Sequence, residues 1–303
     1  MTKYAFFGGE FVPIEKAKVS IMTHALHYGT GCFEGIRAYW NEEEEQLFIF
    51  RMREHYERFQ RSHRILMISL PYSVDDFCQM TVELLRREKF TRDAYIRPLA
   101  YKATEAIGVR LHDLEDAFAL FAVPFGKYIG EEGCKACVSS WRRMDDSIAP
   151  PRGKITGVYI NSALAKTEAV LDGYDEAIML NQDGHVSEGS GENICIVRDG
   201  RIITPPVTDN ILEGITLATL MQLARDELGI EAVERPIDHS ELYIAEEAFY
   251  TGTAAEITPI VEIDHRLVGD GKIGPIVSKL RALFFDVVRG KVEKYRSWCT
   301  PVY

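Results

Sequence analysis

The sequence lacks the long apolar run that a membrane-spanning helix requires. Its longest stretch without a formal charge covers residues 19–33, only 15 residues, and contains two histidines and two threonines. A span needs about 20 mostly apolar residues, so no membrane partner is predicted. Glu10 precedes any apolar signal-peptide core, and Cys299, fifth from the end, fits no prenylation box. We therefore expect a cytoplasmic protein.

Cysteine is also scarce, with six in 303 residues, which is too few for a disulfide scaffold. Cys134 and Cys137 form a single CxxC without a second pair or a nearby histidine, so the pattern of a zinc site is not met. His24 and His27 are three residues apart, and we interpret them as packing residues. No HExxH, Walker or GxSxG motif is present, and no GxGxxG follows a predicted strand. No metal is predicted.

Basic residues are outnumbered, because 35 Lys and Arg against 46 Asp and Glu give a net charge of −11. An acidic chain gains little from phosphate counterion release, which argues against a nucleic-acid partner. The composition is that of a globular protein, with 46% apolar and 27% charged residues. At about 150 residues per domain, the length predicts about two domains.

Alternating apolar patterns and turn residues predict many short strands joined by hairpins, with helices between them. Apolar spacing and stop signals predict the helices. Asp199-Gly200 is typical of a two-residue hairpin turn. The expected class is α+β, with largely antiparallel sheets. The strands are expected at 3–7, 10–14, 35–40, 47–51, 95–101, 117–123, 136–141, 177–180, 193–197, 201–203, 247–250 and 256–263, and the helices at 55–65, 74–88, 158–172, 216–228 and 274–289.

Prolines and glycines concentrate at residues 123–133, which indicates a domain boundary. We expect a small N-terminal domain at 1–123, a linker at 124–133 and a large domain at 134–303. In the helix expected at 158–172, the apolar residues Ile160, Ala163, Leu164 and Leu171 share one face.

Four separate segments carry residues suited to chemistry. Residues 212–216 and 251–255 can each present main-chain N–H groups to an anion. Residues 187–193 place carboxylates beside two glycines, and Lys154 lies between Gly153 and an apolar run. Taken singly, each segment is better explained by an ordinary helix cap, loop, turn or surface lysine.

Taken together, the segments resemble the class IV aminotransferases, pyridoxal-phosphate (PLP) enzymes of fold type IV, and most closely the branched-chain amino acid aminotransferases. The resemblance covers nearly the whole chain. The stretches that carry it are HALHYGTGCFEGIRAY at 24–39, REHYERF at 53–59, AYIRPL at 94–99, SSW at 139–141, the Lys154 loop, SEGSGEN at 187–193, GIT at 214–216 and GTAAEITP at 252–259. It implies a small α/β domain and a larger domain with a mainly antiparallel, barrel-like sheet and flanking helices.

The resemblance also implies PLP as cofactor and assigns residues to it. Lys154 resembles the lysine that carries PLP covalently and then moves the substrate proton. Glu188 resembles the carboxylate that faces the pyridine nitrogen, and Tyr159 the tyrosine on the ring phenolate. The residues expected at the cofactor phosphate and around it are Arg58, Leu212, Ile215, Thr216 and Thr253.

Substrate contacts are implied in the same way, for amino acids and 2-oxo acids. The α-carboxylate would meet the N–H groups of Thr253 and Ala254 and the Tyr95 hydroxyl, and Arg97 would receive the distal carboxylate of glutamate. Tyr28 and Val109 resemble residues lent by a neighbouring subunit, which implies a homodimer or larger homo-oligomer. The side-chain pocket would be walled by Phe33, Phe125, Tyr128 and Tyr159.

The implied reaction is ping-pong transfer of the amino group from L-Leu, L-Ile or L-Val to 2-oxoglutarate, as in branched-chain amino acid biosynthesis. Two departures from the family pattern affect the pocket: Phe125 replaces a frequent tryptophan, and the mobile loop reads Ala-Ile-Gly-Val at 106–109. They suggest activity on (R)-amines or aromatic substrates as well. The alternatives are a D-amino acid or (R)-amine transaminase, an aminodeoxychorismate-type PLP lyase and a non-catalytic binding protein.

Overall fold

The computed structural model describes residues 2–126 and 132–303. Its backbone contacts divide the chain into two units. The first consists of Met1–Gly126, Gly153–Gly157 and Asp286–Tyr303, and the second of Lys127–Arg152 and Val158–Phe285. The short segment that contains Lys154 thus belongs to the first unit. The linker predicted at 124–133 stays a prediction, and its residues 127–131 lie outside the described residues.

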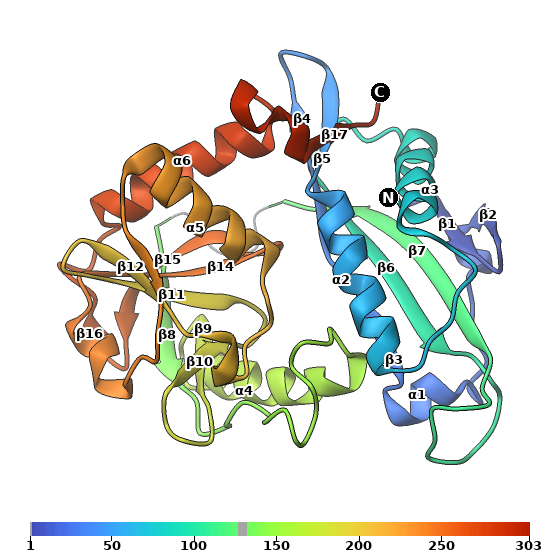
Figure 1. The fold of residues 1–303 in the computed structure, drawn as a ribbon, viewed down its shortest axis with the longest axis horizontal. Helices are drawn as coiled ribbons and strands as arrows, with labels where there is room; N and C mark the ends of the chain where they lie inside the picture. Colours follow the sequence, from blue (N-terminus) through green and yellow to red (C-terminus); the bar gives the residue numbers. More distant parts are fainter. Residues whose placement is uncertain (1, 127–131) are drawn as a thin grey trace. The chain divides into compact units, whose positions relative to one another are not determined.

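The first unit is built on an eight-stranded sheet in the order β17-β5-β4-β6-β7-β1-β2, with β3 paired to β6, and every pair in it is antiparallel (Figure 1). The sheet therefore contains no parallel crossover. Its strands are β1 (Tyr4–Phe7), β2 (Glu10–Pro13), β3 (Gly31–Phe33), β4 (Ile36–Asn41), β5 (Gln46–Phe50), β6 (Ala94–Lys102), β7 (Asp116–Pro124) and β17 (Cys299–Pro301).

Two longer helices of the first unit, α2 and α3, pack on one another and on strands β1, β3 and β7 (Figure 1). The start of α3 is fixed by a capping box, in which the Ser73 hydroxyl accepts from the Asp76 N–H and the Asp76 carboxylate accepts from the Ser73 N–H. Phe77, Leu84 and Leu85 form its buried face. The helical segments of this unit are η1 (Ile14–Lys16), α1 (His24–Tyr28), α2 (Met52–Ile65), α3 (Val74–Glu88) and η5 (Glu293–Trp298).

The second unit is built on a nine-stranded sheet in the order β10-β9-β8-β15-β14-β11-β12-β13, with β16 paired to β15. Three of its pairs are parallel (β8 with β9, β8 with β15, β12 with β13), and the others are antiparallel. The predicted α+β class is confirmed. The strands are β8 (Cys134–Val138), β9 (Glu176–Leu180), β10 (Val186–Gly189), β11 (Asn193–Arg198), β12 (Arg201–Thr204), β13 (Ala232–Glu234), β14 (Glu247–Gly252), β15 (Glu256–Ile263) and β16 (Arg266–Leu267).

Turn and cap residues behave as the sequence predicts. Asp199 and Gly200 both have positive φ, 51° and 70°, as a hairpin turn of that kind requires. Gly229 ends α5 in the left-handed conformation. The helical segments that begin in this unit, or at its border with residue 157, are η2 (Thr156–Val158), α4 (Tyr159–Leu171), η3 (Val207–Asp209), α5 (Ile215–Leu228), η4 (His239–Ile244) and α6 (Pro275–Val288).

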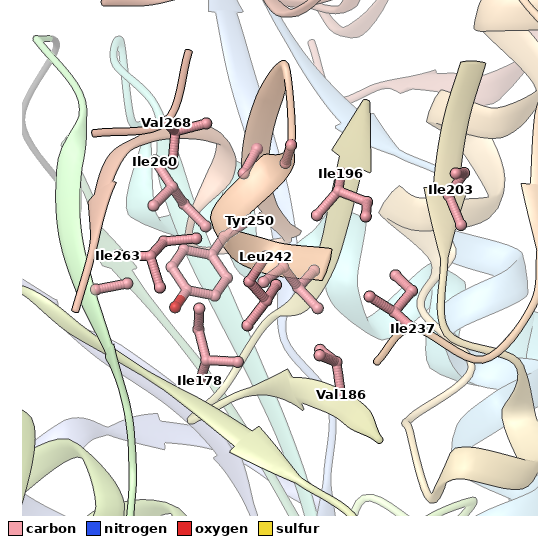
Figure 2. Packing of buried hydrophobic residues seen from close by; sticks show 14 of the residues in the cluster. Ile178, Val186, Ile196, Ile203, Ile237, Leu242, Tyr250, Ile260, Ile263 and Val268 are labelled. Atoms are coloured by element: carbon pink, nitrogen blue, oxygen red, sulfur yellow. The ribbon is translucent and has the colours of Figure 1, made fainter. Parts of the chain in front are cut away.

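The core of the second unit is a cluster of branched aliphatic side chains around Tyr250 (Figure 2). Ile178 and Val186 come from neighbouring strands, and Leu242 and Ile237 come from segments that cover the sheet. The Tyr250 hydroxyl donates to the carbonyl oxygen of Ala177, so its one polar atom is satisfied. This core fixes strand β10, which carries the predicted site residue Glu188, and strand β14, which the predicted residue Thr253 follows directly.

The apolar residues that share one face of α4 in the sequence do not form its buried face. Ile160 is 59% exposed and Leu171 81% exposed. The helix instead buries small residues, Ala165 and Ala169, against Ala177 and Met179 of β9. Small side chains let the helix approach the sheet closely, and apolar periodicity alone does not show which face is chosen.

Other expectations concern what the chain does not contain. Each of the six cysteines, all at described positions, is free. Within residues 2–126 and 132–303, no helix is long and apolar enough to cross a bilayer. The same residues include no group of three His, Cys, Asp or Glu side chains placed to hold a metal ion.

Candidate active site

The predicted site residues fall into two sets, one in each unit. The first set is organised by the segment that carries Lys154, which lies alongside β3. The Phe33 N–H donates to the Lys154 carbonyl oxygen at 3.0 Å, and Cys32 and Ile155 form an antiparallel bridge. The Lys154 N–H donates to the Ser62 hydroxyl on α2 at 3.2 Å. The main chain of Lys154 is therefore held from two sides.

Two glycines allow this segment to lie so close. A Cβ atom on Gly29 would stand 2.5 Å from the Cα of Gly157, far inside contact distance, and Gly29 also has φ +64°. The Gly157 N–H donates to the Gly29 carbonyl oxygen, which also accepts from the Thr156 hydroxyl at 2.8 Å. Gly29 and Gly157 are therefore both required because the segment before β3 and the Lys154 segment lie so close together.

Arg58 is held by a carboxylate that the sequence analysis missed. Its Nε and Nη2 donate to the two oxygens of Glu34, both at 2.8 Å, and the pair is buried. His55 Nδ1 lies 2.8 Å from the same carboxylate. Burial alone would raise the pKa of Glu34, but Arg58 and His55 outweigh it, so that pKa lies well below its usual range.

The Lys154 amine lies near this cluster. Burial lowers the pKa of His55, and the charges of Arg58 and Lys154 lower it further, against the effect of Glu34. Lys154 Nζ also lies 5.0 Å from the centre of the Phe33 ring. The lysine amine therefore lies in the same part of the first unit as the Arg58 cluster. Both Glu34 and His55 fall inside stretches that carry the resemblance, which was the available signal.

Aromatic and arginine side chains of the first unit gather beside this cluster. The Arg97 guanidinium lies 4.4 Å from the centre of the Phe33 ring and 5.3 Å from that of Tyr95, and the Tyr95 and Phe125 rings are 5.1 Å apart. Arg97 Nε is buried and has no hydrogen-bond partner within the described part of the chain. A Cβ on Gly35 would collide with the Tyr95 hydroxyl, at 2.0 Å. The structure thus brings together four predicted substrate residues.

Tyr28 lies on α1, and Val109 lies in the connection between β6 and β7. The Gly108 N–H donates to the Tyr28 hydroxyl at 3.2 Å, so the two predicted residues belong to one local arrangement. Val109 is 88% exposed. Tyr128, the remaining predicted wall residue, lies outside the described residues.

In the second unit, Glu188 is held at both carboxylate oxygens. Arg143 Nη2 lies 2.7 Å from Oε1, while Oε2 accepts from Asn193 Nδ2 at 3.2 Å and from the Leu212 N–H at 3.0 Å. The side chains of Glu188, Arg143 and Asn193 are buried. The predicted cofactor residues Glu188 and Leu212 are therefore in direct contact. Arg143 and Asn193 were missed, although Asn193 ends the SEGSGEN stretch.

The beginning of α5 has no side-chain cap, because its N-cap is Gly214. A Cβ on Gly214 would stand 2.0 Å from Asn193 Oδ1, so only glycine fits beside the Glu188 cluster. Ile215 and Thr216 open the helix, where main-chain N–H groups lack intrahelical acceptors and the helix dipole favours an anion. Tyr159 opens α4, and Thr253 and Ala254 form the turn between β14 and β15.

Comparison with known proteins identifies the family of the chain. Residues 31–263 match the family model described as "Amino-transferase class IV". The chain belongs to the class IV aminotransferases. It is similar over 99% of its length to the probable branched-chain-amino-acid aminotransferase of Aquifex aeolicus, with 52% identity over 97% of that protein.

Solved class IV aminotransferases have the same fold. The branched-chain aminotransferase of Thermoproteus uzoniensis, crystallised with norvaline, matches with a TM-score of 0.96 and 48% identity, over the whole of both chains. The branched-chain amino acid aminotransferase of Thermobaculum terrenum, solved in its PLP form, matches with a TM-score of 0.95 and 40% identity, over 100% of this chain and 99% of that one.

Proposed function

We propose that this protein is a branched-chain amino acid aminotransferase that uses PLP and exchanges amino groups between L-Leu, L-Ile or L-Val and 2-oxoglutarate. The observation that carries the proposal is the fixed Lys154 segment. Its main chain is held by Phe33 and Ser62, and its amine lies 5.0 Å from the centre of the Phe33 ring, next in the chain to the buried Glu34. An amine held beside buried cationic and aromatic groups is suited to covalent work on a carbonyl.

The residues present fit PLP chemically. Its phosphate needs N–H donors and positive charge, and under this proposal the uncapped start of α5 would supply the donors and Arg58 the charge. Its ring nitrogen needs an anion, and Glu188 is a buried carboxylate fixed by three donors. Its aldehyde needs an amine, which Lys154 supplies. When bound, PLP acts as the electron sink for the substrate α-carbon.

The side chains have distinct tasks in this scheme. Glu188 holds a proton at the ring nitrogen, because an opposite charge nearby favours the charged form. Tyr159 donates to the ring oxygen. Lys154 Nζ would take up and return the proton at the substrate α-carbon. Two successive half-reactions through one amine predict ping-pong kinetics.

Substrate selection is assigned to the aromatic and arginine group. Thr253, Ala254 and Tyr95 bind the α-carboxylate, and Arg97 binds the distal carboxylate of glutamate. Phe33 and Phe125 face the aliphatic side chain, and we place Tyr128 and Tyr159 in the same wall. The buried, unpartnered Nε of Arg97 supports this role, because a buried donor without an acceptor is costly unless a ligand supplies one.

The working enzyme is proposed to be at least a homodimer, in which Tyr28 and Val109 serve the neighbouring subunit. The exposure of Ile107 and Val109 supports this, at 75% and 88%. We further propose that Phe125 and the Ala-Ile-Gly-Val sequence at 106–109 widen the substrate range to (R)-amines or aromatic amino acids.

The decisive experiment is a set of half-reactions followed by absorbance, in which the purified holoenzyme receives L-Leu, L-Glu, D-Ala or (R)-phenylethylamine separately. L-Leu and L-Glu should both convert the cofactor to its amine form. Response to D-Ala alone would indicate a D-amino acid transaminase. Pyruvate release over many turnovers from aminodeoxychorismate, without a 2-oxo acid acceptor, would indicate a lyase. Borohydride reduction and peptide mapping should place the label on Lys154, and Lys154→Ala should carry none.

A further inference from the structure

The buried histidine His24 contacts a loop 84 residues away. Its side chain is 1% exposed at the start of α1. Nε2 lies 2.7 Å from the Gly108 carbonyl oxygen, and Nδ1 lies 2.8 Å from the Thr30 hydroxyl. Because a carbonyl oxygen only accepts, Nε2 carries the hydrogen and donates to Gly108. Nδ1 and the Thr30 hydroxyl form the second hydrogen bond, so both ring nitrogens have a partner.

The other polar group of Gly108 is held from the same helix. Its N–H donates to the Tyr28 hydroxyl at 3.2 Å, and the His24 and Tyr28 rings have centroids 4.6 Å apart. Two side chains of α1 thus bind the N–H and the C=O of one residue. Gly108 has φ +146°, which L side chains rarely adopt, so the two contacts select a backbone conformation particular to glycine.

The base of the loop is joined to the same segment. The His24 N–H donates to the Thr104 carbonyl oxygen at 3.0 Å, and Thr23 forms a bridge with Glu105. Beyond Glu105, Ile107 and Val109 extend into solvent on either side of Gly108. The placement of these two apolar side chains therefore depends on how firmly Gly108 is held.

We infer that His24 is a positioning residue for substrate recognition: it holds residues 106–110 through the Gly108 carbonyl, and so fixes Val109 where it contacts the substrate side chain. The inference rests on the proposed function, in which Val109 lines a substrate pocket. His24 touches neither substrate nor cofactor in this account. Its loss should weaken substrate binding and leave the chemical step largely intact.

The test compares His24→Phe, which keeps an aromatic ring but donates nothing, with His24→Gln, whose amide nitrogen can still donate to Gly108. The matched control is His27→Phe on the same helix, because His27 is exposed and its Nε2 contacts the Ile21 carbonyl instead. Each holoenzyme is assayed for KM and kcat with L-Leu. Each is also treated with trypsin, and cleavage after the exposed Arg110 is timed by mass spectrometry.

His24→Phe should be cut after Arg110 about tenfold faster than the wild type and should show a KM for L-Leu raised by about tenfold, since a hydrogen bond to a buried group is lost. Its kcat should stay within about threefold. In both assays His24→Gln should give values closer to those of the wild type than His24→Phe does. The control His27→Phe should give the wild-type cleavage rate and the wild-type KM. If His24→Phe is too unstable to purify, His24→Asn takes its place in the same two measurements, because its shorter side chain keeps an amide near Thr30 but does not reach the Gly108 carbonyl.

Unchanged cleavage in His24→Phe, or an unchanged KM, would overturn the inference, as would a fall in kcat with KM unaltered. Failure of the proposed function gives a separate result. If the wild type did not use L-Leu, the proteolysis would still decide whether His24 holds the loop, because that assay needs no substrate.

Discussion

The N–H of Phe33 donates to the carbonyl oxygen of Lys154 at 3.0 Å, so the proposed catalytic lysine is aligned through its main chain with a strand of the first sheet. The same strand carries the aromatic ring that both Lys154 Nζ and Arg97 approach. Cofactor attachment and glutamate recognition are thereby proposed to depend on one short strand, and the first prediction concerns its fit against the lysine segment.

Gly29→Ala should destabilise the protein by about 2 kcal/mol more than Gly8→Ala. Both residues have nearly the same positive φ, +64° and +63°, but a Cβ on Gly29 would collide with Gly157 while one on Gly8 meets open space. Urea denaturation of the two variants separates steric overlap from backbone conformation. Equal decreases in the free energy of unfolding would mean that the close approach of the two segments does not affect stability.

Glu34→Gln should destabilise the protein by about 3 kcal/mol, because it leaves the buried Arg58 charge without its carboxylate. The control is Glu83→Gln, which breaks an exposed i,i+4 pair with Arg87 and should cost at most about 0.5 kcal/mol. Denaturation midpoints and slopes measure both. A loss for Glu34→Gln no larger than that of the control would contradict the structural importance of the pair.

Arg97→Met should raise the KM for L-Glu and 2-oxoglutarate by about tenfold or more, since a charged donor to the distal carboxylate is removed. The KM for L-Leu should stay within about twofold, because that substrate has no second carboxylate. The Leu-to-Glu comparison in one variant is its own control for folding. A parallel rise for both substrates would assign Arg97 a structural role instead.

Glu192→Gln should remove part of the loss of stability at high pH. Burial, and next the charge of Glu176, raise the pKa of Glu192. Above about pH 5 the unfolded chain has then lost this proton while the folded chain retains it. The unfolded state binds fewer protons, so stability falls as pH rises through this range.

The melting temperatures of wild type and Glu192→Gln should therefore diverge between pH 5 and pH 8, by the equivalent of about 1 kcal/mol or more. Glu231→Gln, at a side chain 63% exposed, should follow the wild type. Parallel curves for Glu192→Gln and the wild type would show that Glu192 is ionised in the folded protein.

Local signals predicted much of the fold. Asp199, Gly200 and Gly229 all adopt positive φ, a conformation that Gly and Asp tolerate better than most residues. Short-range rules were therefore sufficient to predict the hairpin turn and the end of α5. The buried face of α4 did not follow from the sequence, because packing of Ala165 and Ala169 on β9 is a tertiary arrangement that apolar spacing does not encode. The pairing of residues 153–157 with β3 joins segments more than 120 residues apart and had no local signal.

The site residues divide in the same way, into those with a signal in the sequence and those that depend on long-range contacts. Lys154, Arg58 and Glu188 were found through the resemblance, and their roles stay predictions. Their partners Glu34, His55 and Arg143 were not found, because a buried ion pair depends on burial and on long-range proximity. A carboxylate within an apolar stretch, such as Glu34 in the short connection between β3 and β4, is in retrospect a usable signal, since buried acids are seldom unpaired.

The six free thiols have a practical consequence. Five are buried and Cys78 is half-buried, and burial raises the pKa of every one of them, to about 11 in Cys78 and Cys137 and to about 12 in Cys195 and Cys299. At neutral pH they react slowly with maleimides, because the thiolate is the nucleophile. A cysteine introduced beside Val109 would then take up a fluorophore selectively without removal of the native ones, which opens the loop to single-molecule spectroscopy.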